Sequence, residues 1–501
     1  MNTNDSLFSR ITLAEGLLEY ISSHSPDLVS AGLYLKRLKK TIATIATLLA
    51  AATPVSAQSE GETFVHLFEW RWQDVAQECE TFLADAGYHG VQVSPPQEHI
   101  TGFPEGDPWW TRYQPVSYQL QSRSGSAAAF TEMVQRCQQV GVQVYADVVF
   151  NHMAAGSGIG TAGTVYGDRF YPAYSPLDFH RPCDIQPEDY LNDRWRVQHC
   201  DLVSLPDLRT ESPRVQRRVA AYLNDLLQIG VAGFRLDAAK HVPSEDIRRL
   251  LAQVKGEPFV FQEVIDPGYE AISAQEYLDN GWVTDFQYGK VMGPLFRQGR
   301  LADLSSWNPS LPSGHAIVFI DNHDNQRGHG GAGNVLTFAE PDLYTLATVF
   351  MLSYPYGYTR VMSSYHFDGQ TEAGPPQQPV HEPQGLNCGS ITWQCEHRWP
   401  AIVGAVKFRR ATQAYPAVTR WWDNGNNQIA FGRGNLGHLV INRETTWMAE
   451  TIATDLAPGD YCNVLADPQD PCETFRVDAQ GKMVVRLAPL KAIALLKTVQ
   501  P

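Results

Sequence analysis

The chain has 501 residues, of which 43% are hydrophobic, and a formal net charge of -15. This length and composition fit a globular protein of two or three domains and exclude an intrinsically disordered chain. With an excess of acidic residues, nothing in the composition suggests a basic surface for nucleic acid. We therefore expect a protein that acts on a neutral substrate or binds cations, without a nucleic-acid partner.

The N-terminal region has the pattern of a secretory signal. A basic run, LKRLKK, occupies residues 35–40, and residues 41–52 are apolar and too few to span a bilayer. The small residues VSA at 55–57 predict cleavage before Gln58. A long stretch precedes the basic run, which leaves open a translation start downstream of Met1. We exclude residues 1–57 from the fold and expect a secreted, extracellular protein.

The cysteine pattern favours disulfide bonds. An even number of cysteines in a secreted chain suggests disulfides, and without a CxxC pair a zinc or redox site is not expected. Spacing alone leaves the connectivity open, although the pairs 388/395 and 462/472 are close enough for local bridges. The eight cysteines are Cys79, Cys137, Cys183, Cys200, Cys388, Cys395, Cys462 and Cys472.

Short strand-like segments alternate with helical patterns through most of the chain. Repeated βα units of this number predict an α/β fold with a parallel (β/α)8 TIM barrel. No segment after residue 57 has the length and apolarity of a transmembrane helix, so we expect no membrane partner. The expected strands are 63–68, 90–93, 142–150, 233–236, 259–261, 283–286, 316–320 and 358–362.

Two segments depart from the βα repeat. Residues 151–208 are rich in Gly, Pro, Asp and Tyr and too long for a simple loop, which predicts a small domain inserted after the third strand. From residue 417 onward, alternating apolar runs separated by Gly and Asn turns predict an antiparallel β domain. The barrel would then comprise 58–150 and 209–416, and the C-terminal domain 417–501.

Three carboxylates stand at the ends of three predicted strands: Asp237, Glu263 and Asp324. In such barrels the active site lies at the C-terminal ends of the strands. Retaining glycosidases need one carboxylate as nucleophile and a second, protonated one as acid, and a third can orient the sugar. The alternative for each residue alone is a surface acid or a helix cap.

The segment DPWWTRY places Trp109, Trp110 and Tyr113 after the second predicted strand. Exposed aromatic faces stack on the apolar faces of pyranose rings, so these residues are candidate sugar-binding groups. Ordinary core aromatics are the alternative. In GFRLDAAKH, strand alternation places Arg235 and Asp237 together on one face.

Seven motifs, in order along nearly the whole mature chain, carry a family resemblance. They are GVQVSPPQE (90–98), WWTRYQPVSY (109–118), DVVFNHM (147–153), GFRLDAAKH (233–241), FQEVID (261–266), DNHDNQRGHG (321–330) and PYGYTRVMSSY (355–365). With them the chain resembles the α-amylases, and specifically their chloride-dependent, animal-type branch. The resemblance implies a monomeric endo-hydrolase that cleaves internal α-1,4 bonds of starch, glycogen and malto-oligosaccharides with retention of configuration.

The resemblance also implies roles for individual residues. Asp237 matches the nucleophile, Glu263 the acid/base and Asp324 the transition-state stabiliser. The Gly-rich loop 328–334, expected to close over substrate, looks one residue shorter than in mammalian members, which puts its mobility in doubt. The residues that match substrate-binding positions are Trp109, Trp110, Tyr113, His152, Lys240, His323 and His329.

A calcium site follows from the same resemblance. Asn151 and Asp207 match side-chain ligands, and Gln198 and His241 match positions that donate backbone carbonyls. Ligation by oxygen alone suits a hard cation such as Ca²⁺. Family members carry arginine at the position of Gln198, a change that a carbonyl ligand tolerates. Four disulfides are implied as well: 79–137, 183–200, 388–395 and 462–472.

A chloride site is implied by Arg235, Asn322 and Arg360. Two guanidinium groups inside a barrel require a counter-charge, because an unpaired buried cation is costly. Chloride would supply it and leave Glu263 free to keep its proton. The alternative is that Arg235 pairs only with the carboxylates and that Arg360 only packs in the barrel.

Other function classes stay open at this point. A transglycosylase or a glucosidase uses the same three carboxylates on different sugars, and the loops that distinguish them are poorly read from one sequence. A non-catalytic starch-binding barrel could keep the fold, although the intact set of acids argues against it.

Overall fold

The computed structural model describes residues 62–497, except for 331–332, 390, 468 and 470. All of these residues belong to one compact unit, Gln58–Pro501. The predicted signal peptide lies outside the described residues.

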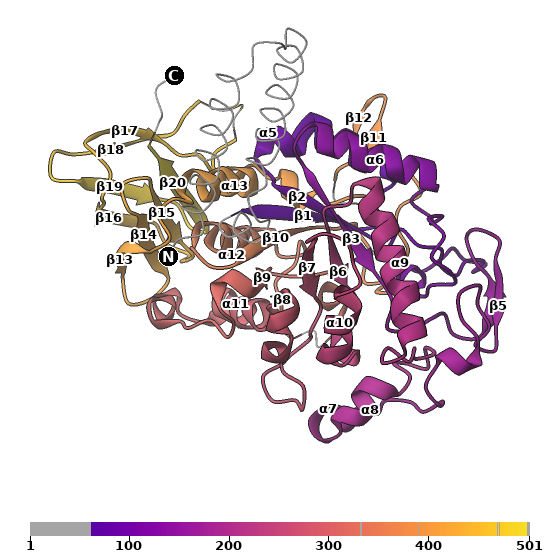
Figure 1. Cartoon of the computed structure of the whole chain (residues 1–501). Helices are drawn as coiled ribbons and strands as arrows, with labels where there is room; N and C mark the ends of the chain where they lie inside the picture. Colours follow the sequence, from indigo (N-terminus) through magenta and orange to yellow (C-terminus); the bar gives the residue numbers. More distant parts are fainter. Residues whose placement is uncertain (1–61, 331–332, 390, 468, 470, 498–501) are drawn as a thin grey trace, which may run out of the picture. The chain divides into compact units, whose positions relative to one another are not determined.

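Eight parallel strands close into a barrel, which confirms the predicted fold class (Figure 1). The last strand pairs with the first, with Thr63 beside Thr359. The strands are β1 (Thr63–Leu67), β2 (Gly90–Val93), β3 (Gln143–Val148), β6 (Gly233–Leu236), β7 (Phe259–Gln262), β8 (Trp282–Thr284), β9 (Ala316–Val318) and β10 (Tyr358–Ser363).

Six of the expected strands differ from the structure by one or two residues at an end. In place of the expected strand 283–286, β8 ends at Thr284 and a helix begins at Phe286. The reason is Asp285, whose side chain accepts a hydrogen bond from the backbone N–H of Tyr288 and so caps the helix.

Helices surround the barrel, and their apolar faces pack against it (Figure 1). The longest, α9, begins at a proline in its first turn and ends before Gly230, which adopts the left-handed conformation with φ 112°. The main helices are α4 (Trp72–Glu78), α6 (Ala127–Gln139), α9 (Pro213–Ile229), α10 (Ser244–Leu251), α11 (Phe286–Gln298), α12 (Pro341–Ser353) and α13 (Pro400–Thr412).

The barrel interior has an aromatic layer and a polar layer. Phe64 contacts Tyr145, Phe261 and Tyr358, with ring centroids 5.5, 5.6 and 4.7 Å away. Side chains alternate between faces along a strand. The residue two positions after Phe261 is Glu263, so the same inward face carries an acid where the strand ends. The aromatic layer thus fills one end of the barrel, and polar groups occupy the other.

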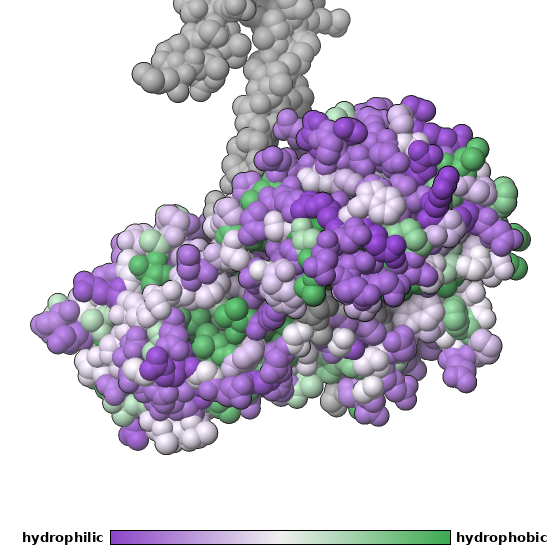
Figure 2. Space-filling model, turned by 90° about the horizontal axis from the view of Figure 1, so that it is seen from below, coloured by the Kyte–Doolittle hydropathy of each residue, from purple (hydrophilic) through white to green (hydrophobic). Residues whose placement is uncertain are grey.

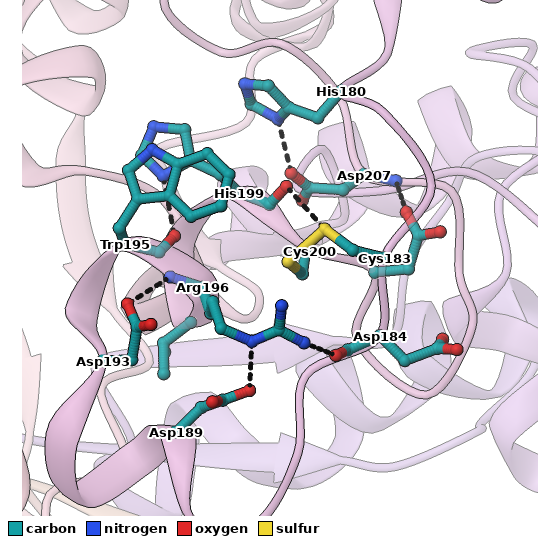
Figure 3. The surroundings of a disulfide bond; sticks show 12 residues. His180, Cys183, Asp184, Asp189, Asp193, Trp195, Arg196, His199, Cys200 and Asp207 are labelled. Carbon is teal, nitrogen blue, oxygen red and sulfur yellow. Dashed lines mark hydrogen bonds and ion pairs between the residues drawn. A yellow bond between two sulfur atoms is a disulfide. The ribbon is translucent and has the colours of Figure 1, made fainter.

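The segment that follows β3 contains a hairpin of β4 (Ser157–Ile159) and β5 (Val165–Gly167), then α7 (Asp189–Asn192) and α8 (Arg194–His199). Figure 3 shows how its disulfide is surrounded by polar contacts. Asp193 caps α8 by accepting from the N–H of Arg196, whose guanidinium bonds Asp189 at 2.8 Å. These local bonds order a segment with little regular structure.

The C-terminal part consists of two four-stranded antiparallel sheets, as predicted. A separate cluster of buried apolar residues, among them Val440, Met448 and Ile493, lies between them. One sheet contains β13 (Thr419–Asp423), β14 (Gln428–Arg433), β15 (Gly437–Asn442) and β20 (Lys491–Leu496), and the other β16 (Met448–Ala453), β17 (Gly459–Cys462), β18 (Thr474–Val477) and β19 (Lys482–Leu487). A two-stranded sheet, β11 (His381–Glu382) with β12 (Gly385–Leu386), precedes them.

All four predicted disulfides are confirmed: Cys79–Cys137, Cys183–Cys200, Cys388–Cys395 and Cys462–Cys472. Hydrophilic residues cover most of the face drawn in Figure 2, and hydrophobic residues form separate patches. Within the described part of the chain, no helix has the length and apolarity needed to cross a membrane.

Candidate active site

A cavity of about 580 Å³ lies at the C-terminal ends of the barrel strands. It brings together every residue predicted for catalysis or substrate binding, and one predicted calcium ligand. These lining residues are Trp109, Trp110, Tyr113, His152, Asp237, Lys240, His241, Glu263, His323, Asp324 and His329.

Asp237 and Glu263 follow the neighbouring strands β6 and β7 and bind the same guanidinium. Arg235 Nη1 lies 2.7 Å from Asp237 Oδ1, and Arg235 Nη2 contacts Glu263 Oε1. The backbone N–H of Ala238 donates to Glu263 Oε2 at 3.0 Å. One arginine and one amide therefore hold both carboxylates at the floor of the cavity.

Asp147 is a buried member of this cluster that the sequence did not single out. It lies beside Arg235 in the pairing of β3 with β6, and Arg235 Nη1 is 2.6 and 2.8 Å from its two oxygens. Tyr113 donates to Asp147 at 3.1 Å. Side chains alternate between faces along β3, so Asp147 points into the barrel as Tyr145 does. This alternation could have identified Asp147 from the sequence.

Burial and mutual repulsion raise the pKa values of two acids in this cluster, Asp324 and Asp237. Burial raises the pKa of Asp324 to about 7, and the nearby Glu263 adds to that effect. Burial also raises the pKa of Asp237 well above its usual range, against the attraction of Arg235. Carboxylates that share a site do not all ionise together. The cluster therefore suits chemistry in which one acid is ionised and another keeps its proton.

Two histidines in the cavity are neutral at neutral pH. Burial lowers the pKa of His152 to about 4, and its Nε2 lies 2.9 Å from the carbonyl of Tyr113. Burial also lowers the pKa of His323 well below its usual range. His323 stacks on Tyr113 with ring centroids 5.0 Å apart. Neutral imidazoles can exchange hydrogen bonds with sugar hydroxyls without adding charge.

The aromatic residues divide into core and surface roles. Trp109 and Tyr113 are only 5% and 8% exposed, and the indole N–H of Trp109 donates to Thr371 at 2.9 Å. Trp110 is half-buried and meets Phe103 edge to face. Trp110 thus offers the most accessible ring, while Trp109 and Tyr113 also belong to the core, as the alternative interpretation held.

Residues from other loops complete the cavity. The Lys240 ammonium bonds the carbonyl of Ile265 at 2.5 Å and contacts Glu270, an acid that the sequence did not single out. His329 Nε2 lies 3.3 Å from Glu372 at the rim. Part of the Gly-rich loop, residues 331–332, lies outside the described residues.

Two family models match the chain: "Alpha amylase, catalytic domain" over residues 113–263, and "Alpha amylase, C-terminal all-beta domain" over 421–498. An α-amylase of Pecten maximus is 45% identical over 439 residues, which are 81% of this chain and 85% of that protein. Pancreatic α-amylase 2a5 of Mus musculus is 44% identical over 448 residues, 81% of this chain and 88% of its own. The chain belongs to the α-amylase family. It is accordingly an enzyme with α-amylase activity that hydrolyses starch.

Solved structures agree. α-Amylase I of Eisenia fetida has a TM-score of 0.81 and 38% identity, and the match covers 87% of this chain and 97% of that one. A mutant of that enzyme has been solved with maltohexaose, at the same score. A gamma-CGTase of an alkalophilic Bacillus clarkii has a TM-score of 0.64, 17% identity and coverage of 88% and 71%, which shows the fold alone.

The residues predicted for the α-amylase calcium site suit an oxygen-binding cation. Asn151 Oδ1 is buried and has no hydrogen-bond partner among the described residues. The backbones of Asp207 and His152, the residue after Asn151, form an isolated β-bridge. Burial raises the pKa of Asp207 to about 7. His180, which the sequence did not single out, lies 2.6 Å from Asp207 (Figure 3). Within the described residues, no group of three or more His, Cys, Asp or Glu side chains is arranged to hold a metal ion by itself.

The residues predicted for the chloride site include an incompletely bonded arginine. Arg360 is 2% exposed, and its guanidinium lies over the Phe319 ring, 4.3 Å from the centroid. Among the described residues only its Nη1 has a hydrogen-bond partner, Gln92 at 3.1 Å. Its Nε and Nη2 are buried without one. Burial and the neighbouring Arg235 lower the pKa of Arg360 to about 10, which still leaves it charged. Buried N–H donors on a cation suit an anion. Arg235, in contrast, is already paired with carboxylates.

Proposed function

We propose that this enzyme is an endo-acting α-amylase that cleaves internal α-1,4 bonds with retention of anomeric configuration. The observation that carries the proposal is the binding of Asp237 and Glu263, from neighbouring strands, to the single Arg235 guanidinium. This arrangement brings two acids close together. Retaining glycosidases hold their acids about 5 to 5.5 Å apart, whereas inverting enzymes leave room for a water between them.

The proposed mechanism uses three acids in separate roles. Asp237 attacks the anomeric carbon while Glu263 gives its proton to the leaving glycosidic oxygen, which releases one chain end and leaves a glycosyl ester on Asp237. Glu263 then takes a proton from water, and this water breaks the ester. Asp324 binds sugar hydroxyls and stabilises positive charge on the ring. The neutral His152 and His323 would orient the same sugar.

The stereochemistry of the first product tests this mechanism. Proton NMR during early hydrolysis of a malto-oligosaccharide should show the α-anomer, because two inversions restore the configuration. Initial formation of the β-anomer would contradict it. Chromatography of the products separates hydrolysis from the alternative, an α-glucan transglycosylase, which would give elongated or cyclic products.

Substitution of the two principal acids tests their assignment. Asp237→Asn and Glu263→Gln should each reduce kcat by at least about 10⁴-fold with an unchanged circular dichroism spectrum, because each keeps its shape but loses the nucleophile or the proton donor. A near wild-type rate in either variant would show that another carboxylate performs the reaction.

Chloride activation is proposed from Arg235, Asn322 and Arg360. The unpaired Nε and Nη2 of Arg360 support it, since a bound anion would satisfy them. When bound, the anion would supply negative charge beside the two arginines. Arg235 would then attract Glu263 less strongly, and Glu263 would keep its proton to a higher pH.

A halide titration after exhaustive dialysis tests the chloride site. Activity should rise with chloride, and the loss without chloride should be greatest on the alkaline side of the optimum, where the acid loses its proton. Arg360→Gln should abolish the dependence, because one buried cation then no longer needs a counter-ion. Full activity without halide and an unchanged pH profile would refute the site.

Calcium binding is proposed for Asn151 and Asp207 with the carbonyls of Gln198 and His241. The orphaned Asn151 Oδ1 supports it. A ligand that binds only the native state raises its stability by mass action, so chelation should lower Tm and added Ca²⁺ should restore it. Asn151→Ala should lose this response to Ca²⁺. An unchanged Tm after thorough chelation would exclude these ligands.

Secretion is proposed from the basic and apolar pattern of residues 35–57, with four disulfides in support, because such bonds persist in oxidising compartments. Recovery of an enzyme that begins at Gln58 from the medium of expressing cells would support it. Retention of the uncleaved chain inside cells would contradict it.

A further inference from the structure

We propose that the chloride site includes Gln92 of β2, whose side-chain amide donates to the anion and orients Arg360. The inference rests on the proposed function, in which Arg235, Asn322 and Arg360 bind chloride. It adds a ligand that the family resemblance does not assign, and it makes β2 a part of the barrel that sets the affinity for the anion.

Two of the three ligands proposed above are already bonded. Arg235 lies against three carboxylates, and Asn322 Nδ2 donates to Asp324 at 3.3 Å. Arg360 alone of the three has buried N–H groups, at Nε and Nη2, without a hydrogen-bond partner among the described residues. An anion beside Arg360 is therefore bound best if other unpaired donors lie close to that side chain.

Gln92 supplies such a donor. It is fully buried, and its Oε1 accepts a hydrogen bond from Arg360 Nη1 at 3.1 Å. Since a guanidinium has donors only, the oxygen of the amide must face Arg360, and the nitrogen is left for another group. This Nε2 is buried and lacks a hydrogen-bond partner within the described part of the chain. A buried N–H without an acceptor is costly, and an anion beside Arg360 would remove that cost.

The register of the barrel strands points Gln92 into the interior. Gln92 lies beside His66 of β1 on one side and beside Tyr145 of β3 on the other. Tyr145 belongs to the aromatic layer, where its ring centroid is 5.5 Å from that of Phe64. Adjacent residues of paired strands share a face, so Gln92 and His66 both face the interior, as Tyr145 does.

His66 gives a second unpaired donor on the same wall. It is fully buried, and neither ring nitrogen has a hydrogen-bond partner among the residues described. Burial, and then the charges of Arg360 and Arg235, lower the pKa of His66 well below its usual range. A neutral imidazole keeps one N–H. Gln92, His66 and Arg360 thus offer N–H donors beside two cations. A small anion satisfies both, whereas a second cation would be repelled and water would bring no charge.

Chloride NMR tests the inference with a readout other than activity. The line broadening of chloride gives its Kd for the wild type and for Gln92→Met, which keeps the length of the side chain and removes the amide. The Kd should rise by about 10-fold or more, as expected for the loss of a hydrogen bond to a charged group.

Gln262→Met is the matched control. Gln262 of β7 is also fully buried, but it follows the inward-facing Phe261 and so points away from the barrel interior. Its Nε2 donates to the carbonyls of Tyr277 and Trp282 at 2.9 and 3.3 Å. The control should lose stability and keep the Kd of the wild type for chloride.

Gln92→Glu provides a second, nearly isosteric variant. Its carboxylate should pair with Arg360 in place of the anion. A ligand that binds the native state raises its stability, so the Tm of the wild type should be higher in sodium chloride than in the same concentration of sodium methanesulfonate, whose anion is bulkier. The Tm of Gln92→Glu should be the same in the two salts.

The outcomes separate this inference from the proposed function. A wild-type enzyme without measurable chloride binding refutes the chloride site and, with it, the role of Gln92. If the wild type binds chloride and Gln92→Met changes the Kd no more than Gln262→Met does, only the role of Gln92 is overturned. A Tm of Gln92→Glu that still rises in chloride as it does in the wild type has the same meaning.

Discussion

Arg327 has its guanidinium enclosed by four aromatic rings, three residues after Asp324. The ring centroids of Phe68, Tyr365 and Phe367 lie 5.1, 4.7 and 4.5 Å from its Cζ, and that of Trp109 lies 5.9 Å away. The side chain is 2% exposed. The stacking interactions of a guanidinium hold these rings in place, so Arg327 links the aromatic wall of the cavity to the loop that carries Asp324.

The same side chain fixes the backbone beside the third acid. Arg327 Nη1 donates to the carbonyl of His323 at 3.0 Å, and its backbone N–H donates to the carbonyl of Asp324 at 2.9 Å. We infer that Arg327 is a positioning residue, since it contacts His323, Asp324 and Trp109 and is not itself among the residues that line the cavity.

Arg327→Lys should lower kcat by about 10- to 100-fold, with a smaller change in KM, because an ammonium keeps the charge but loses the planar stacking that fixes Asp324. Steady-state kinetics with a malto-oligosaccharide check this. If Arg327 has only a structural role, Arg327→Lys and Arg327→Met should both lower Tm and leave the kcat of the folded enzyme unchanged. That combination of results would refute the positioning role.

At the scale of elements, the loop after β10 is fastened by a buried acid. Glu396, in the 3-10 helix Glu396–Arg398, accepts from the backbone N–H of Ser364 at 2.7 Å. Burial raises the pKa of Glu396 from its ordinary 4.5 to about 7. The folded enzyme therefore holds the proton of Glu396 more tightly than the unfolded chain does. The free energy of unfolding is highest below about pH 4.5, where both states are protonated, and it decreases as the pH rises to about 7, because only the unfolded state ionises in that range.

Glu396→Gln should remove this dependence, because the amide keeps an oxygen for the Ser364 N–H and does not ionise. The shift in pKa corresponds to a decrease of about 3 kcal/mol in the free energy of unfolding of the wild type across this pH range. The stability of the variant relative to wild type should therefore rise between pH 5 and pH 8, as measured by urea unfolding. A constant difference across that range would show that Glu396 ionises in the fold as freely as in the unfolded chain.

Elements with a strong local pattern were predictable from the sequence. The eight strands are short segments rich in apolar and β-branched residues, and Asp237, Glu263 and Asp324 follow three of them, so the rule for barrel strand ends was enough to bring these acids together. The disulfide pairing and the ligand sets came from the family resemblance and not from spacing.

Long-range partners were not predictable in the same way. Asp147 meets Arg235 because β3 and β6 pair in a particular register, across the whole inserted segment. The contact of Lys240 with Glu270 and the ring cage of Arg327 depend on loop paths. No local periodicity encodes such contacts. The boundary of β8 was wrong because the cap formed by Asp285 outweighed the strand pattern.

At the scale of the whole molecule, two arginines of the C-terminal part, Arg433 in β14 and Arg443 just after β15, bind the ends of barrel helices. Arg433 of β14 donates to the carbonyls of Ser353, the last residue of α12, at 2.9 Å and of Thr412, the last residue of α13, at 3.2 Å. Arg443 donates to the carbonyls of Phe296 and Arg297 in the last turn of α11. The last carbonyls of a helix lack partners within it and carry the negative end of its dipole.

The C-terminal part thus supplies hydrogen-bond donors to the C-terminal ends of α11, α12 and α13. We therefore expect the barrel and the C-terminal sheets to unfold together. Arg433→Met should lower the free energy of unfolding by at least about 3 kcal/mol, because it leaves the carbonyls of Ser353, Thr412 and Tyr415 without their charged donor. Calorimetry should show a lower Tm and a separate early transition for the C-terminal part. Arg420→Met is the matched control on β13, since the Arg420 side chain is 56% exposed. Among the described residues it bonds only Asp455, in a surface ion pair at 2.7 Å that is worth at most about 1 kcal/mol. If the two variants lose equal stability and keep one transition, the helix ends do not couple the barrel to the C-terminal sheets.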